Sequence, residues 1–198
     1  RSSDLGMRNA SVEYLKRSID TAAALGAPSV SLCPGYSLYG QGRERAWQAM
    51  LESLRILCSY AKDLPLTLLL EPGNRHETDL VITIEDGLRA IHDLGVPMGL
   101  CVDTGHCFVN GESLSDVVSL VRDVSCHYHI DDNNGLTDDH MVPGDGKMRY
   151  EIFLRSLLSS GYSGFLAVEL GFQYTADPDV AVKRSADFMR KAFAEITC

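Results

Sequence analysis

The sequence lacks several features that would place it in a specialised class of protein. It has no apolar run of about 18 or more residues, which argues against a membrane span. No basic segment followed by an apolar one opens the chain, so we expect no secretory signal. None of its six cysteines stands in CxxC spacing. We therefore expect reduced thiols in a cytoplasmic protein, with neither a disulfide framework nor a zinc ribbon.

An excess of basic residues is also missing. The chain has 18 lysines and arginines against 27 aspartates and glutamates, a formal net charge of -9, which weighs against nucleic acid as a partner. Its 198 residues are 45% hydrophobic and 23% charged, ordinary for a globular protein with one substantial core. No linker or low-complexity segment interrupts them. We expect a single domain over residues 1–198.

Helix-like and strand-like segments alternate along the chain. Periodicity predicts helices over 10–27, 43–63, 83–95, 113–123, 150–161 and 177–196, and strands over 29–33, 66–71, 99–103, 126–131 and 165–170. Thr83 with Asp86 has the spacing of a capping box, and Gly95 is a C-terminal stop. Strict alternation implies parallel strands with right-handed crossovers. Two α/β architectures fit, a doubly wound sheet and a (β/α)8 TIM barrel.

The strand faces favour the barrel. Leu68 and Leu70 are typical of one face, which is large and apolar throughout, whereas Thr67 belongs to a smaller and more polar face. A doubly wound sheet would be apolar on both faces. The βα units repeat about every 34 residues, so eight units need about 270, close to the ~250 of this barrel. We therefore predict the C-terminal five βα units, strands 4–8, of a chain whose N-terminal piece is absent, and the first residue is Arg1 rather than Met.

Four consecutive predicted strands end in a side chain that can bind a metal: Glu71, Asp103, His129 and Glu169. The active site of such barrels lies at the carboxyl ends of the strands. Three carboxylates and an imidazole suit Mn²⁺, Mg²⁺, Co²⁺ or Zn²⁺. One acidic residue at a strand end is often a cap or a loop residue. Four in succession predict a metal site, because inward carboxylates would otherwise repel one another.

Four segments together resemble a known family: "LLLEPGNRHET", "CVDTGHCF", "HYHIDDNNGLTDDHMVPGDGKM" and "GFLAVELGF". They are similar to the sugar isomerase/epimerase superfamily with the xylose isomerase-like TIM barrel, and the third is most similar to fructoselysine 3-epimerase-like members. The resemblance implies one divalent ion, Mn²⁺ first, held by the four strand-end residues. It also implies that Glu77 and His106 bind substrate, and we place His140 with them.

The resemblance implies a metal-dependent isomerase or epimerase acting on a sugar or sugar derivative. Glu71 and Glu169 would exchange the proton from opposite faces, through a metal-bound cis-enediolate. The partner would be a small carbohydrate, and relatives are often dimers or tetramers, which leaves a homo-oligomer open. One departure is Gly135, which stands where the epimerases have a substrate-binding arginine.

Three alternatives stay open. The first is a sugar dehydratase or lyase on the same scaffold. The second is a nuclease like the AP endonucleases, because His106, Asp138 and His140 resemble the spacing of the further zinc ligands of those enzymes. The third is a barrel used only for binding. For the segment 143–147, "PGDGK", a plain turn is favoured over contact of its N–H groups or of Lys147 with a phosphate or carboxylate.

Overall fold

The computed structural model describes residues 5–197 and shows an α/β chain in which strands and helices alternate. The strands are β1 (Ser29–Leu32), β2 (Thr67–Leu70), β3 (Gly99–Asp103), β4 (Cys126–Ile130) and β5 (Leu166–Val168). The helices are α1 (Leu5–Ala24), α2 (Arg43–Ala61), α3 (Ile84–Leu94), α4 (Thr104–Asn110), α5 (Leu114–Leu120), α6 (Tyr150–Ser160) and α7 (Pro178–Thr197), with a 3-10 helix η1 (Phe172–Tyr174). The predicted alternation is confirmed. The chain divides into two compact units, Arg1–Cys101 and Val102–Cys198, which we call the first and the second unit.

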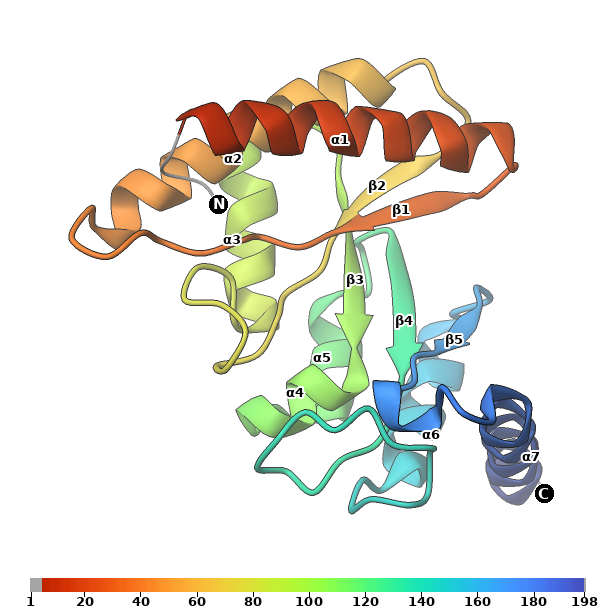
Figure 1. Ribbon diagram of the computed structural model, residues 1–198. Helices are drawn as coiled ribbons and strands as arrows, with labels where there is room; N and C mark the ends of the chain where they lie inside the picture. Colours follow the sequence, from red (N-terminus) through yellow and green to blue (C-terminus); the bar gives the residue numbers. More distant parts are fainter. Residues whose placement is uncertain (1–4, 198) are drawn as a thin grey trace. The chain divides into compact units, whose positions relative to one another are not determined.

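Parallel strands form the sheet of the first unit. β1 pairs with β2 from Ser29↔Thr67 to Leu32↔Leu70, and β2 continues to β3 through Leu70↔Leu100. In Figure 1, helix α1 lies along β1 and β2, and it contacts both β1 and α2. The side chains of β2 are buried from Leu68 onward, as expected for a parallel strand covered by helices.

Helix α3 begins and ends as its sequence predicts. The Thr83 hydroxyl accepts a hydrogen bond from the Asp86 N–H, and the Asp86 carboxylate accepts one from the Thr83 N–H, which completes a capping box. Gly95 follows with a φ of 70°, a left-handed conformation that glycine adopts without a steric penalty.

The second unit contains a parallel pair of strands covered by helices. β4 pairs with β5 from Tyr128↔Leu166 to Ile130↔Val168. Tyr128 is 2% exposed, and its ring packs against Phe153 of α6 at a centroid distance of 5.7 Å. Helix α6 contacts α5 and α7 (Figure 1).

One helix was not predicted from the sequence, and another begins earlier than predicted. Helix α4 was not predicted, because its seven residues are too few to show an apolar period. Its start is set by the side chain of Asp103 as N-cap and its end by Gly111, which has a φ of 79°. Helix α1 begins at Leu5, ahead of the predicted residue 10, and its first turn is mostly exposed.

The loop between β4 and α6 is folded around the carboxylate of Asp132, which is fully buried. Its Oδ2 accepts hydrogen bonds from the N–H groups of Gly144 (2.9 Å) and Gly146 (3.1 Å), and its Oδ1 accepts from Asn133 (2.8 Å) and Met148 (3.1 Å). A Cβ on Gly146 would overlap this carboxylate. The N–H groups of the "PGDGK" turn therefore bind a carboxylate of the protein itself, and the motif has a structural role.

Within residues 5–197, no helix combines the length and the apolar composition needed to cross a bilayer. The cysteines of that range are free thiols: Cys33, Cys58, Cys101, Cys107 and Cys126. Cys198 lies outside the described residues.

Candidate metal and substrate site

Three of the four predicted metal ligands lie together in the second unit. His129 Nδ1 is 2.6 Å from Glu169 Oε2 and 3.9 Å from Asp103 Oδ2. Each of the three residues offers an oxygen or nitrogen atom within 4.8 Å of those of the others. Two carboxylates and one imidazole at this spacing form a donor set of the kind that binds divalent cations.

The parallel ladder explains why His129 and Glu169 meet. His129 lies opposite Ala167, and the N–H of Glu169 continues the ladder by donating to the Ile130 carbonyl at 3.1 Å. Side chains two residues apart point to the same face of a strand, so Glu169 shares a face with Ala167 and His129. The hydrogen bond from His129 lowers the pKa of the Glu169 carboxyl against the opposing effect of burial.

Asp103 has two roles at the carboxyl end of β3. Its Oδ1 accepts a hydrogen bond from the His106 N–H at 2.7 Å, which caps helix α4. Its Oδ2 is the oxygen on the side of His129. The three-residue spacing from Asp103 to His106 therefore fixes both the predicted metal ligand and the first turn of the helix that carries a predicted substrate-binding residue.

Glu71, the fourth predicted ligand, follows β2 in the first unit. Its N–H donates to the Leu32 carbonyl at 3.0 Å, which extends the pairing of β1 with β2 by one residue. Its Oε2 accepts a hydrogen bond from the Ser31 hydroxyl at 2.6 Å, and the residue is only 7% exposed. Ser31 pairs with Leu69, so its side chain points to the same face as Glu71. No sequence pattern indicated this serine, which orients a predicted catalytic carboxylate.

Glu77 lies in the loop that follows β2 and is exposed. The loop is folded around Asn74, which is fully buried. The Asn74 carbonyl accepts hydrogen bonds from the N–H groups of Glu77 (3.0 Å) and Thr78 (3.2 Å), and its side-chain oxygen accepts one from the His76 N–H (2.9 Å). The first unit thus presents Glu77 on a loop with a defined backbone conformation.

The other two predicted substrate-binding residues, His106 and His140, lie in one cluster with two aspartates. Asp138 Oδ2 is 3.1 Å from His106 Nε2 and 3.1 Å from His140 Nε2. His140 Nδ1 lies 3.2 Å from Asp131 Oδ2. Their side chains are at most 19% exposed, so these charges interact in a poorly solvated environment.

Burial raises the pKa of Asp131, whereas the pKa values of His140 and Asp138 shift in the directions expected for an ion pair. Hydrogen bonds to Asp131 and Asp138 raise the pKa of His140 to about 11. Burial alone would raise the pKa of Asp138, but its hydrogen bonds with His106 and His140 outweigh that effect and hold it well below the ordinary value. His140 is therefore a cation at neutral pH, and Asp138 is its counter-ion.

Asp131 was not among the predicted site residues. Its Oδ1 accepts a hydrogen bond from the Gly105 N–H at 2.9 Å, and a Cβ on Gly105 would overlap the carboxylate. The sequence did contain one signal for it, the pair Asp131–Asp132 directly after a strand. Burying two adjacent carboxylates costs free energy unless each has a partner. Here Asp131 lies beside His140, and Asp132 binds the N–H groups of the loop.

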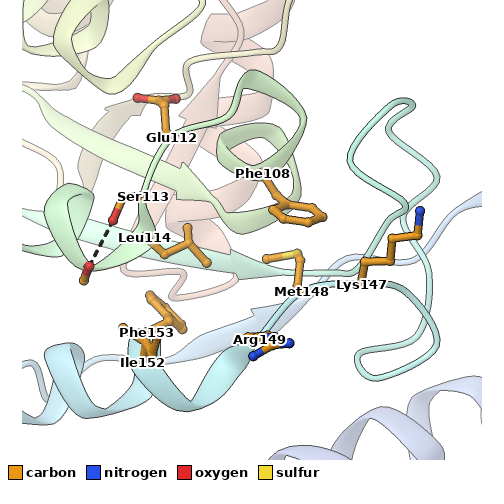
Figure 2. Close-up of a pocket in the computed structure, with 10 residues that line it drawn as sticks. Phe108, Glu112, Ser113, Leu114, Lys147, Met148, Arg149, Ile152 and Phe153 are labelled. Carbon is orange, nitrogen blue, oxygen red and sulfur yellow. Dashed lines mark hydrogen bonds between the residues drawn. The ribbon is translucent and has the colours of Figure 1, made fainter.

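A separate cavity of about 340 Å³ opens between α4, α5 and the start of α6 (Figure 2). Figure 2 shows the Phe108 ring and the Met148 side chain on one side of it, with the Lys147 and Arg149 side chains close by. Its lining contains none of the predicted metal or substrate residues.

Comparison with known proteins identifies the family of this chain. A family model described as "Xylose isomerase-like TIM barrel" matches residues 1–192. The chain belongs to this family. The predicted fold class, an α/β chain from a TIM barrel, is thereby confirmed, and so is the resemblance to this family.

Curated members of the xylose isomerase-like family include sugar epimerases. The chain is 28% identical over 193 residues to fructoselysine 3-epimerase of Shigella flexneri, covering 97% of this chain and 70% of that protein. It is 24% identical over 174 residues to D-psicose 3-epimerase of Agrobacterium fabrum (strain C58), covering 85% and 58%. The prediction of an enzyme agrees with these names.

Solved structures of similar proteins share the fold. A D-tagatose 3-epimerase-like protein superposes with a TM-score of 0.84 at 23% identity, covering 99% of this chain and 74% of that one. The IOLI protein, solved with a zinc atom, gives a TM-score of 0.82 at 22% identity, covering 98% and 72%.

Proposed function

We propose that this protein is a divalent-metal-dependent epimerase or isomerase of a sugar or sugar derivative. The observation that carries the proposal is the convergence of Asp103, His129 and Glu169 from the ends of three strands. Glu71, at the end of β2, is the fourth ligand of the proposed site. The zinc atom in the IOLI structure supports a divalent ion, and among such ions we propose Mn²⁺, with Mg²⁺, Co²⁺ and Zn²⁺ as alternatives.

The residues of this chain fit such an ion in kind and in spacing. When bound, the ion would polarise the carbonyl and hydroxyl oxygens of the sugar and acidify the carbon between them. Glu71 and Glu169 are the proposed acid and base, removing the proton from that carbon on one face and returning it on the other. Ser31 would keep the Glu71 carboxylate in one orientation through its hydrogen bond. Glu77 and His106 would hold the substrate oxygens.

The substrate we propose first is a ketose or a ketose amine, because the relatives named above act on fructoselysine and D-psicose. Gly135 stands where the family resemblance places a substrate-binding arginine, so the contact of that arginine with a sugar would be missing here. Its φ is 81°, and a Cβ added there would lie 3.3 Å from the Phe108 ring, so a long side chain would be strained at that position.

The experiment is solvent deuterium incorporation. The full protein is freed of metal and reloaded with one ion at a time. It is then incubated in D₂O with fructoselysine, D-psicose, D-tagatose and D-fructose. Incorporation of one deuterium at C3 with appearance of the C3 epimer supports the proposal, and incorporation with loss of water identifies a dehydratase. No exchange with any sugar and any of the four ions contradicts the proposal.

A nuclease is the second candidate, and one observation favours it. His106, Asp138 and His140 do come together, as the resemblance to AP endonuclease zinc ligands requires. The net charge of -9 opposes it, because a phosphate backbone is repelled by an acidic surface. Incision of a duplex containing one abasic site, together with more than one metal per chain, would establish this alternative.

A further inference from the structure

Four side chains of the second unit form a continuous series of ion-pair contacts. It runs from Asp131 through His140 and Asp138 to His106, with nitrogen–oxygen distances of 3.2, 3.1 and 3.1 Å. His106 is the only member that the proposed function brings to the substrate as a direct ligand of its oxygens. The other three have no role in the proton transfer.

The far end of the series is rigid. Asp131 follows β4 directly and is fully buried, its carboxylate is bound by the Gly105 N–H, and its carbonyl accepts a hydrogen bond from the Tyr150 hydroxyl. The carboxylate occupies the space that a Cβ on Gly105 would need. Asp131 therefore places a carboxylate of defined position beside the His140 ring.

His140 is held in an uncommon backbone conformation. Its φ is 42°, the only positive value of a non-glycine residue in the described part of the chain. A conformation of this kind persists only where its surroundings determine it. Here the His140 carbonyl accepts a hydrogen bond from the Gly171 N–H at 3.0 Å, and its two ring nitrogens face two carboxylates. Both nitrogens must carry protons to donate, so His140 presents one N–H to Asp138.

Asp138 connects this anchor to His106. A carboxylate accepts hydrogen bonds and does not donate them, so the nitrogen of His106 that faces Asp138 must be the protonated one, Nε2. The hydrogen bond that one ring nitrogen of a histidine makes sets the orientation and the tautomer of the ring. Asp138 therefore sets the orientation and the tautomer of His106.

We propose that Asp138, held in place by His140 and Asp131, is a positioning residue that keeps His106 in its Nε2-protonated tautomer and in the orientation needed to bind substrate. The inference rests on the proposed function for the role of His106 in substrate binding. It gives His140 a supporting role in place of the direct substrate contact that we predicted for it from the sequence. Asp131 and Asp138 become residues of functional importance without touching the substrate.

The first test is independent of activity. In uniformly ¹⁵N-labelled protein, long-range ¹H–¹⁵N correlation spectra distinguish the two tautomers of a neutral histidine, and a His106→Gln variant assigns the signals. We expect the Nε2-protonated pattern for His106 in the wild type and in Asp145→Asn, a control in the same loop whose carboxylate instead pairs with Arg184 on the surface. In Asp138→Asn we expect a mixed or reversed pattern. The wild-type pattern in Asp138→Asn would overturn the proposal.

The second test separates positioning from folding and from metal binding. In Asp138→Asn and Asp131→Asn we expect kcat/KM to fall on the order of tenfold, the effect of losing a hydrogen bond to a charged group, mostly through KM. Metal content should stay at one ion per chain, with melting temperatures close to that of Asp145→Asn. If Asp138→Asn does not fold, Asp131→Asn gives the same readouts. A normal kcat/KM in a folded variant contradicts the proposal.

Metal analysis excludes the competing explanation. Loss of a second ion in Asp138→Asn, while Asp145→Asn retains it, would show that His106, Asp138 and His140 bind a metal and that no hydrogen-bonded series exists. If the wild type epimerises no sugar but its His106 tautomer changes in Asp138→Asn, the proposed function fails and the positioning of His106 is retained. The two ideas therefore fail separately.

Discussion

His129 Nδ1 lies 2.6 Å from Glu169 Oε2, and this contact joins neighbouring parallel strands at their carboxyl ends. Backbone pairing of β4 with β5 holds the Glu169 carboxylate and the His129 imidazole close enough for one cation to bind both. Asp103 completes the group from β3. Two predictions depend directly on this arrangement.

Replacement of a proposed acid or base should stop the reaction. Glu169→Gln and Glu71→Gln keep the shape of the side chain but remove the basic oxygen. We expect kcat to fall by about 10²- to 10⁴-fold, the contribution of general acid–base catalysis. The exposed residue Glu195 provides a control as Glu195→Gln, which should retain full activity. Full turnover in Glu71→Gln or Glu169→Gln would refute the assignment of these roles.

His129→Ala should act mainly on metal binding. Removal of the only nitrogen ligand should weaken binding of the ion by more than about a hundredfold, because losing even a residue that supports a ligand typically costs ten- to a hundredfold. Titration with Mn²⁺ after chelator treatment measures this. His92→Ala is the matched control, since the His92 side chain is 88% exposed. Equal Mn²⁺ affinity in both variants would remove His129 from the site.

Asp132→Asn should destabilise the loop between β4 and α6. The buried carboxylate accepts four backbone N–H groups, and an amide would direct its own N–H groups at some of them. We expect the free energy of unfolding in urea to fall by about 2 to 4 kcal/mol. Asp145→Asn, which loses only an exposed ion pair with Arg184, should cost less than about 1 kcal/mol. A loss in Asp132→Asn no larger than in the control would contradict the role of Asp132.

His140 should make stability depend on pH. Its pKa is raised to about 11 in the folded chain, against about 6.5 for an unperturbed histidine, so the folded state holds a proton that the unfolded state releases. This contribution is complete below about pH 6.5 and is lost as the pH rises toward 11. Between pH 7 and pH 9.5, wild-type protein in chelator should lose up to about 1.4 kcal/mol per pH unit more than His140→Gln. Parallel slopes for the two proteins would show that His140 is not ion-paired in solution.

Local sequence was enough to predict the order of the helices and strands and the strand-end residues that could bind a metal. Apolar periods of two and 3.6 residues located the strands and the longer helices, because burial of one face requires those periods. Glu71, Asp103, His129 and Glu169 were found because each ends a strand, and parallel strands place such ends on one side. The start of α3 at Thr83 could be predicted because a capping box involves only two residues three positions apart in the sequence.

Tertiary structure alone decided which polar residues meet. Ser31 and Glu71 are 40 residues apart, and only the register of β1 on β2 brings the hydroxyl to the carboxylate. Asp131 and Asp132 are adjacent in the sequence, yet one binds a histidine and the other the amides of a loop. No periodic pattern encodes those partners, because they depend on how a loop without regular structure folds back on the strand before it. Where each strand lies along the sequence depends on local patterns of apolar residues. A network of hydrogen bonds forms only when distant segments of the chain are in contact.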